Sequence, residues 1–348
     1  MIKIAIIGTG GMGHHHARVF QHLEGCTLVA ACGPDRSKVA EFAKAFKIQG
    51  VYTRLTVLLD HADVDALVIA APDRHHASLS LQGIAAGKHI LCEKPLAENY
   101  AQAQEMTRAA QQAKVINMVN FTYRQSAALH QARRMVQEGA LGRVIHVEGS
   151  HLQSWLGSNT WGNWRKDPSW LRKLSIQHGS QGVLGDLGGH LFDFASYVAG
   201  DFKSVQCQIR TFDKNAGKQI DGYVLDANDS AVLNAELKNG ALGTFHMSRW
   251  ATGYTNRVCL AVYGDKGALR VSIEDSDDVL EVCSGADVDR GTWKTMPMQP
   301  LPTNQQRFVA AIQAGTQVQP DFARGTAVQQ VIDVCYASAL DGEGKQIP

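Results

Sequence analysis

Hydrophobic and polar positions follow one repeating arrangement through the first third of the chain. The apolar run Ile2–Ile7 ends in a glycine-rich turn, after which Ala17, Phe20 and Leu23 recur at roughly helical spacing. This pattern predicts a buried strand, a tight turn and a helix. Further strands are expected at 27–32, 66–70, 88–92 and 115–119, with helices at 37–46, after Pro72 through residue 86, and at 101–113. Strands and helices that alternate at these lengths predict a doubly wound parallel sheet covered on both faces.

The pattern changes near residue 120, where short, partly alternating apolar segments replace the regular succession. One helix is expected at 127–138, followed by strands at 144–152, 204–211, 230–237, 241–249, 257–263, 268–273 and 279–282. Turn signals such as Asn239-Gly240 separate several of these strands. The second part is therefore predicted to be an α+β domain with an open, predominantly antiparallel sheet. Final helices are expected at 304–314 and 326–340, and they could pack back on the first domain.

Length, charge and cysteine content limit the number of domains and the kinds of partner that this chain can have. The 348 residues are enough for two domains with separate cores, which we place at 1–121 and 122–348. A net charge of +1 gives no broad electrostatic field, so neither nucleic acid nor membrane is expected as a partner. No apolar run reaches the ~18 residues of a membrane span, and the N-terminal run lacks the features of a signal peptide, so a cytoplasmic location is expected. Seven scattered cysteines without C-x-x-C spacing predict free thiols, and no metal site is expected.

Gly8, Gly10 and Gly13 fit the spacing G-x-G-x-x-G directly after the first predicted strand. In this motif, the first glycine permits a sharp turn, the second lets the backbone approach a pyrophosphate, and the third lets the helix pack on the strand. The phosphates would bind the free N–H groups at the helix N-terminus. The turn, with Gly11 and Met12, is therefore predicted to bind a dinucleotide. The alternative is a glycine turn without a ligand.

The end of the second predicted strand bears on the choice of cofactor. In many dinucleotide-binding folds an acidic residue there accepts the adenosine ribose hydroxyls, but this chain has Gly33 at that place. Arg36, Ser37 and Lys38 could bind a 2′-phosphate, while Asp35 could still reach a ribose. These residues favour NADP slightly over NAD. The alternative is that they are solvated charges at the start of a helix.

Ligands of open α/β sheets collect beyond the carboxyl ends of the strands. The candidate cofactor-binding residues at these ends and in the turns beside them are Gly8, Gly10, Gly11, Met12, Gly13, Arg36, Ser37, Ala71, Pro72, His76, Glu93, Lys94 and Asn120. Lys94 is also a candidate catalytic residue. Its ammonium group, followed by a proline that fixes the backbone, could point at a substrate oxygen.

A second candidate site lies in the glycine-rich segment 182–193. A helix expected at 187–198 would place Asp186 and His190 one turn apart on one face. A carboxylate in that position can orient an imidazole and stabilise its protonated form, as general acid–base catalysis requires. The alternative is that Asp186 caps the helix and His190 belongs to the core. Four glycines in the segment favour close approach by a ligand.

Four of the six tryptophans lie within the segment 155–170. Indole rings stack on the apolar faces of sugars, although tryptophan is also ordinary core material. Basic residues interleave with them and could meet an anionic group or face water. The candidate substrate-binding residues are Lys94, Tyr123, Arg124, Trp161, Trp164, Arg165, Asp186 and His190.

Together these motifs resemble those of the glucose-fructose oxidoreductase, inositol dehydrogenase and MocA (Gfo/Idh/MocA) family of NAD(P)-dependent oxidoreductases, over essentially the full chain. The segments that carry the resemblance are 8–13 with His16, 87–95 (GKHILCEKP), 139–142 (GALG), Asp186 with His190, and 248–253 (SRWATG). The resemblance implies a Rossmann domain and a second domain whose open sheet often forms the oligomer interface. A homodimer or homotetramer is therefore expected, with the active site between the domains.

The resemblance also assigns roles to single residues. Lys94 matches the catalytic lysine of the family, Asp186 its active-site aspartate and His190 its proton-transferring histidine. It places Glu93 near the nicotinamide and implies a cis bond between Lys94 and Pro95. The implied activity is reversible oxidation of a secondary alcohol on a sugar or cyclitol by NAD(P). Two alternatives remain open: an NAD-dependent glycosidase that acts through transient oxidation, and a non-catalytic nicotinamide-binding regulator.

Overall fold

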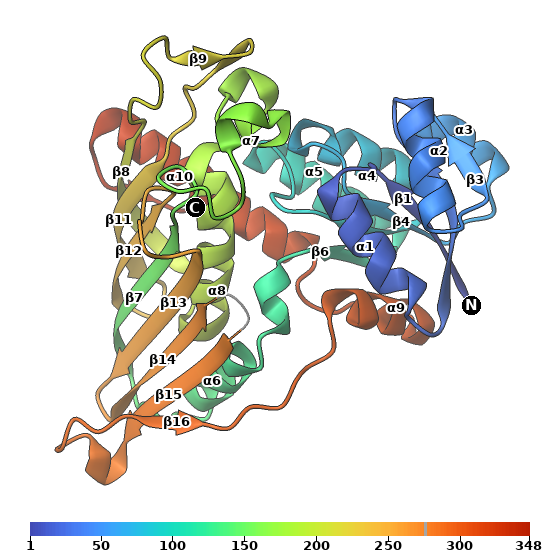
Figure 1. The fold of residues 1–348 in the computed structure, drawn as a ribbon. Coiled ribbons are helices and arrows are strands. Elements are labelled where there is room, and N and C mark those ends of the chain that lie inside the picture. The colour runs from blue at the N-terminus through green and yellow to red at the C-terminus, as the bar shows by residue number, and fades with distance from the viewer. Residues whose placement is uncertain (275–276) are drawn as a thin grey trace. The chain divides into compact units, whose positions relative to one another are not determined.

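The chain forms two compact units in a computed structural model that describes residues 1–274 and 277–348 (Figure 1). Unit 1 comprises residues 1–122 and 302–329. Unit 2 comprises residues 123–301 and 330–348. The final segment of the chain is thus divided between the two units.

Unit 1 contains a six-stranded sheet in which every pair of neighbouring strands is parallel, in the order β3-β2-β1-β4-β5-β6. The strands are β1 (Ile2–Ile7), β2 (Cys26–Cys32), β3 (Gly50–Tyr52), β4 (Ala66–Ile69), β5 (His89–Cys92) and β6 (Asn117–Val119). The chain first adds β2 and β3 on one side of β1, and then adds β4, β5 and β6 on the other side. Ligands of such doubly wound sheets bind at the carboxyl ends of the strands beside this reversal. The predicted fold class is confirmed.

Helices cover the sheet of unit 1, and the last of them come from the C-terminal part of the sequence. They are α1 (Gly11–Gln21), α2 (Arg36–Ala45), α3 (Leu55–His61), α4 (His76–Ala85), α5 (Tyr100–Ala113), α9 (Asn304–Ala314) and the first part of α10 (Phe322–Asp341). Ile4 and Ile6 of β1 share one core with Phe20 of α1, Phe42 of α2 and Phe308 of α9. Helix α9 therefore belongs to the core that supports β1.

Unit 2 contains a nine-stranded sheet in the order β16-β15-β14-β13-β7-β12-β11-β8-β17. Its strands are β7 (Val144–Gln153), β8 (Phe202–Arg210), β11 (Ser230–Leu237), β12 (Leu242–Ser248), β13 (Asn256–Gly264), β14 (Gly267–Glu274), β15 (Asp277–Ser284), β16 (Lys294–Met296) and β17 (Lys345–Gln346). Strands β7 and β12 pair in parallel, and the other pairs are antiparallel. This confirms the predicted, predominantly antiparallel sheet.

Two helices, α6 (Ala127–Gln137) and α8 (Gly189–Ala199), lie along the sheet of unit 2 (Figure 1). Helix α8 is buried along nearly its whole length and packs against β7 and β13. A π-helical turn over Leu184–Gly188 precedes it, so the α-helix begins two residues later than the expected 187–198. Such turns place side chains at angles that a regular α-helix does not allow, and they often occur at functional sites.

The predicted elements match observed ones to within about four residues at their ends, but several short elements were not predicted. These are β3, α3, α7 (Pro168–Arg172), β9 (Gln219–Ile220), β10 (Tyr223–Val224), β16 and β17. Elements of two to seven residues contain too few repeats for periodicity to identify them. Among the residues that the structure describes, no helix has the length and apolar character needed to cross a bilayer.

Candidate active site

The glycine turn after β1 has two tightly packed positions and one open position. Gly8 has a φ of +107°, and a side-chain Cβ there would lie 2.5 Å from the carbonyl oxygen of Ala70. A Cβ on Gly13 would lie 2.1 Å from the carbonyl oxygen of Gly8, so any larger residue would separate α1 from the turn. At Gly10 a Cβ would meet none of the described residues within 4 Å. The first and third glycines therefore allow close packing, and the second leaves room beside the backbone.

The same turn forms the N-terminus of α1. Gly10 is the N-cap residue in extended conformation, and within the described part of the chain no side chain caps this end. The first N–H groups of a helix lack intrahelical partners and carry partial positive charge, which suits a phosphate. Open space at Gly10 and Gly11 allows a ligand to approach these groups. The turn therefore fits the pyrophosphate of a dinucleotide.

The start of α2 determines which groups could meet the adenosine ribose. The carboxylate of Asp35 caps this helix, accepting hydrogen bonds from the main-chain N–H groups of Ser37 at 3.0 Å and Lys38 at 3.2 Å. The Nζ atom of Lys38 also lies 3.8 Å from this carboxylate. Arg36 and Ser37 are exposed at the helix start, next to the Gly33 turn. The acid nearest the end of β2 thus stabilises the helix itself.

Glu93, directly after β5, is the centre of a buried polar network. Its Oε1 atom lies 2.7 Å from Nε2 of His16 and accepts a 2.7 Å hydrogen bond from Nδ2 of Asn120. The second ring nitrogen of His16 lies 3.1 Å from Nε2 of Gln305, and Asn304 donates to Oδ1 of Asn120 at 3.1 Å. All five residues are at most 7% exposed. The two residues of α9 were not predicted, because Asn304 lies 184 positions from Asn120 and Gln305 lies 289 positions from His16.

The charge of Glu93 is stabilised inside unit 1. Burial raises the pKa of Glu93, but the hydrogen bond and charge of His16, the hydrogen bond from Asn120 and the charge of Lys94 together hold it below its usual value. A carboxylate that accepts several hydrogen bonds stays ionised even when buried. Glu93 is therefore a fixed negative charge at the edge of the sheet where β5 ends.

Lys94 follows this anchored carboxylate and is half-buried. Its main-chain N–H donates to Oε2 of Glu93 at 3.4 Å, and its bond to Pro95 is cis, as the family resemblance implied. Because the glutamate is held by buried partners, the backbone that carries the lysine side chain is held as well.

His76, at the start of α4, is fully buried with both ring nitrogens beside carbonyl oxygens. Nδ1 lies 2.7 Å from the oxygen of Pro95, and Nε2 lies 2.9 Å from that of Ala71. Burial lowers the pKa of His76, but Cys92, Asp73 and the Pro95 carbonyl outweigh it and raise the pKa to about 10. The ring nitrogens of this predicted cofactor ligand are thus bonded to the protein's own main chain.

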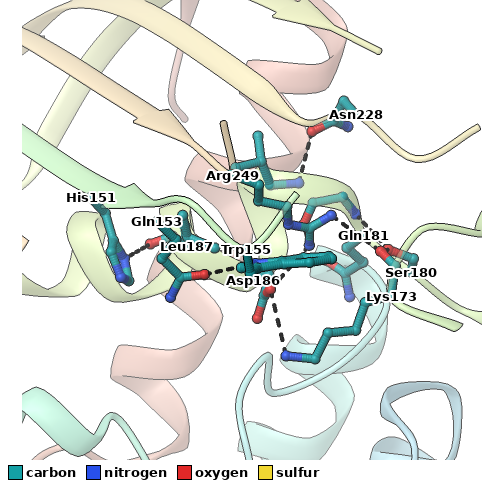
Figure 2. A network of polar contacts seen from close by, with 12 residues as sticks. His151, Gln153, Trp155, Lys173, Ser180, Gln181, Asp186, Leu187, Asn228 and Arg249 are labelled. Atoms are coloured by element: carbon teal, nitrogen blue, oxygen red, sulfur yellow. Dashed lines mark hydrogen bonds and ion pairs between the residues drawn. The ribbon is translucent and has the colours of Figure 1, made fainter. Parts of the chain in front are cut away.

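In unit 2, Asp186 lies in the π-helical turn and faces two cationic side chains (Figure 2). Arg249 donates to Oδ2 of Asp186 at 3.0 Å, and Nζ of Lys173 lies 3.8 Å from the same atom. Arg249 is 1% exposed and also donates to the carbonyl oxygens of Gly182 at 3.1 Å and Lys173 at 3.2 Å. Arg249 thus fixes both the carboxylate of Asp186 and the glycine-rich segment around it. The segment 248–253 carried only the family resemblance, and this role of Arg249 was not predicted.

His190, on the first turn of α8, is 8% exposed and lies in an aromatic and polar cluster. The ring of Tyr123 meets it edge-on at 4.9 Å, and that of His151 lies 6.0 Å away. Asn256 connects these neighbours, since its Nδ2 donates to the Tyr123 hydroxyl at 2.8 Å and its Oδ1 lies 3.1 Å from Nε2 of His151. Of this cluster, only Tyr123 and His190 were predicted.

A polar row continues from this cluster along β7. Gln153 donates to Oδ1 of Asn256 at 2.8 Å and accepts a 3.1 Å hydrogen bond from the indole nitrogen of Trp155. His151 and Gln153 alternate along β7, and alternate residues of a strand share one face; Trp155 follows two residues beyond the end of the strand. This spacing was the signal in the sequence that could have identified the row.

The remaining substrate-binding candidates have different environments. Arg124, 1% exposed, forms two hydrogen bonds with Asp193 at 2.6 and 2.7 Å, so its guanidinium group is part of a buried pair. Trp164 is also 1% exposed and donates to the carbonyl oxygen of Leu156 within a hydrophobic cluster. Neither position supports direct contact with a sugar.

Trp161 and Arg165 are accessible. Trp161 is 36% exposed and stacks on Trp170, with ring centroids 5.7 Å apart and an interplanar angle of 21°. Arg165 is exposed, with its guanidinium group 4.2 Å from the centre of the Trp164 ring. Of the predicted tryptophans, Trp161 is the one with an indole surface open to a ligand.

The parallel sheet, the glycine turn and the anchored glutamate–lysine pair define a Rossmann-type dinucleotide-binding oxidoreductase. Residues 2–121 match the family model described as "Oxidoreductase family, NAD-binding Rossmann fold", and residues 129–270 match that of the GFO/IDH/MocA C-terminal domain. The chain therefore belongs to the Gfo/Idh/MocA family of oxidoreductases, which confirms the family predicted from the sequence.

Similar proteins match most or all of the chain. Levoglucosan dehydrogenase from Pseudarthrobacter phenanthrenivorans is 26% identical over 100% of this chain and 98% of its own length. Myo-inositol 2-dehydrogenase from Thermotoga maritima is 25% identical over 84% of this chain and 80% of its own. Among solved structures, levoglucosan dehydrogenase in complex with NADH and levoglucosan matches with a TM-score of 0.86, at 26% identity over 100% of this chain and 99% of that chain.

Proposed function

We propose that the chain catalyses reversible hydride transfer between a secondary alcohol of a sugar or cyclitol and the nicotinamide of NAD(P). The observation that carries the proposal is Lys94, held at the carboxyl end of β5 by the buried Glu93 network, in the same sheet whose β1 ends at the open glycine turn. The names of the similar proteins support this substrate class, because they specify an anhydrosugar and an inositol as substrates.

The glycine turn is proposed to hold the pyrophosphate, and Ala71, Pro72, Glu93 and Asn120 the nicotinamide half. When bound, the nicotinamide supplies the hydride acceptor or donor. In the oxidising direction, a ring nitrogen of His190 takes the hydroxyl proton. The ammonium group of Lys94 stabilises the negative charge that develops on the substrate oxygen.

Asp186 is proposed to stabilise the protonated form of His190. Arg249 donates to the carboxylate of Asp186, and Lys173 lies nearby. A negative charge near an imidazole favours the imidazolium form. Proton transfer by a positioned side chain typically contributes about 10²- to 10⁴-fold in rate.

The exposed indole of Trp161 and the hydroxyl of Tyr123 are proposed as substrate contacts. Trp161 stacked on Trp170 forms a flat apolar surface that suits the apolar face of a sugar ring. Tyr123, whose ring meets that of His190, could bind a substrate hydroxyl group.

For the cofactor, we propose a modest preference for NADP. Gly33 places no carboxylate where NAD-binding folds commonly carry one, and the carboxylate of Asp35 is occupied in capping α2. Arg36 and Ser37 are exposed at the helix start and suit a 2′-phosphate. The solved relative named above contains NADH, so both cofactors must be compared directly.

We also propose a homodimer or homotetramer formed through the open sheet of unit 2. Val232 of β11 and Leu242 of β12 share one face of the sheet, through the pairs Val232–His246 and Glu236–Leu242, and are 52% and 61% exposed. Exposed apolar side chains gathered on one sheet face are typical of an interface.

The test is a screen of monosaccharides, anhydrosugars and inositols with NAD and with NADP, followed by the absorbance of the reduced nicotinamide. The proposal expects stoichiometric cofactor reduction with at least one polyol. Cleavage of a glycoside without net cofactor reduction would instead indicate a glycosidase. Binding of a partner protein that depends on cofactor, with no turnover of any polyol, would indicate a regulator.

A further inference from the structure

His76 makes a pattern of contacts that a neutral histidine does not satisfy. Its Nδ1 atom lies 2.7 Å from the carbonyl oxygen of Pro95, and its Nε2 atom lies 2.9 Å from that of Ala71. Both distances are those of good hydrogen bonds. A carbonyl oxygen accepts hydrogen bonds and cannot donate, so each ring nitrogen must be the donor.

Only the imidazolium form carries a hydrogen on both ring nitrogens. In either neutral tautomer, one nitrogen lone pair would face a carbonyl lone pair at hydrogen-bond distance. Because His76 is 0% exposed, water cannot relieve that repulsion. The two carbonyl contacts are therefore hydrogen bonds at the same time only if the ring is protonated, in a site from which solvent is excluded.

The surroundings contain groups that stabilise this charge. The Cys92 side chain interacts with the ring from β5, and Asp73 contributes negative charge from the turn that precedes α4. His75, next to it in sequence, is exposed, and partial burial together with the charges of Arg74 and His76 lowers the pKa of His75. Against the cost of burial, the surroundings raise the pKa of His76 to about 10.

The two carbonyl groups belong to the ends of neighbouring strands. Ala71 follows β4 by two residues, and Pro95 follows Glu93 and Lys94 after β5. The His76 side chain thus connects the main chain after β4 with the main chain after β5, at the edge of the sheet where Lys94 lies. On the other side of Lys94, Glu93 is anchored by His16 and Asn120.

We propose that His76 is a positioning residue that acts as a buried imidazolium, joining the main chain after β4 to that after Lys94 and so holding the lysine in place for turnover. This inference rests on the catalytic role proposed above for Lys94. It also replaces the expectation that His76 contacts the cofactor, because both of its ring nitrogens are used within the protein.

The protonation state is tested on the wild-type protein by ¹H–¹⁵N NMR of the histidine rings. The resonances of His76 are assigned by their disappearance in His76→Gln. Both of its ring nitrogens should remain protonated from about pH 6 to about pH 9, where an ordinary histidine is neutral for most of the range. A His76 ring that loses a proton near pH 6.5 would overturn the inference, whether or not the protein turns over a polyol.

The positioning role is tested by kinetics of His76→Gln against the matched control His75→Gln. The inference expects His76→Gln to lower kcat by about 10²-fold, because small displacements of catalytic groups have effects of that size, with the cofactor Kd within about twofold of wild type. His75→Gln should leave both constants unchanged. An unchanged kcat in His76→Gln, or a raised cofactor Kd with normal kcat, would overturn it. If no polyol is turned over by wild type, the proposed function fails, while the NMR result still decides the state of His76.

Discussion

Arg249 Nη2 lies 3.0 Å from Asp186 Oδ2, and the side chain that makes this bond is 1% exposed. The same guanidinium group binds the carbonyl oxygens of Gly182 and Lys173. The proposed active-site carboxylate is therefore held by a buried cation from the strand-rich half of unit 2, more than sixty positions away in sequence.

Replacement of this cation should destabilise unit 2. Arg249→Met leaves Asp186 without its buried partner, and breaking such a pair typically lowers the free energy of unfolding by about 3–5 kcal/mol. Lys173→Met is the matched control, because the Lys173 side chain is 42% exposed and its ion pair is longer; a loss of no more than about 1 kcal/mol is expected. All six tryptophans lie in unit 2, so urea unfolding followed by their fluorescence measures this difference. Equal losses in the two variants would contradict the role assigned to Arg249.

Two substitutions in the glycine turn should have separate effects, one on packing and the other on cofactor binding. Gly13→Ala places a Cβ 2.1 Å from a carbonyl oxygen and should lower the melting temperature of the protein without cofactor. In Gly10→Ala the added Cβ meets no atom of the described part of the chain within 4 Å, so the melting temperature should stay near that of wild type, while the cofactor Kd should rise by at least about tenfold. Thermal unfolding and fluorescence titration check the two parts. A Gly10→Ala variant that binds both cofactors normally would show that the pyrophosphate does not approach this residue.

Glu93 should make stability depend on pH in the acidic range. The pKa of Glu93 in the folded protein lies below the usual value of 4.5. The charged carboxylate therefore stabilises the fold fully at pH values above 4.5. This stabilisation is lost as the pH falls through the lowered pKa of the folded state. Wild type should therefore exceed Glu93→Gln in unfolding free energy most clearly at about pH 6, and the difference should shrink below about pH 4. Glu98→Gln, at an exposed position nearby, is the control. If the difference in unfolding free energy between wild type and Glu93→Gln grew as the pH fell, the stabilising role of the Glu93 charge would be contradicted.

The cofactor proposal predicts an effect at the start of α2. Arg36→Ala should lower kcat/KM for NADP by about tenfold through loss of a charged contact, while the value for NAD changes by less than about twofold. Lys44→Ala, in the last turn of the same helix, should change neither value. Initial rates with both cofactors check this. If Arg36→Ala affects both cofactors equally, Arg36 does not recognise the 2′-phosphate.

The parallel sheet and the glycine turn were predictable because both depend on local sequence patterns. The run Ile2–Ile7 and the three glycines contain the strand, the turn and the open position within twelve residues. The parallel pairing of β7 with β12 was not predictable, since register between distant strands depends on tertiary contacts.

The candidate site was predicted only where its residues lie close together in sequence. Glu93 with Lys94, and Asp186 with His190, are local motifs. Their partners Gln305 and Arg249 come from remote segments, and nothing in their own neighbourhoods indicates those contacts. The bonds that His76 makes to main-chain carbonyls have no sequence signature, because any residue supplies a carbonyl.

The most direct test of the proposed function compares Lys94→Ala with wild type on a polyol found in the screen. If the ammonium group stabilises the developing alkoxide, kcat should fall by about 10²- to 10³-fold, while the cofactor Kd, measured by nicotinamide fluorescence, should stay within about twofold of wild type. A Lys94→Ala variant that turns over the same polyol at the wild-type rate would remove Lys94 from the reaction and contradict the proposed function at its centre.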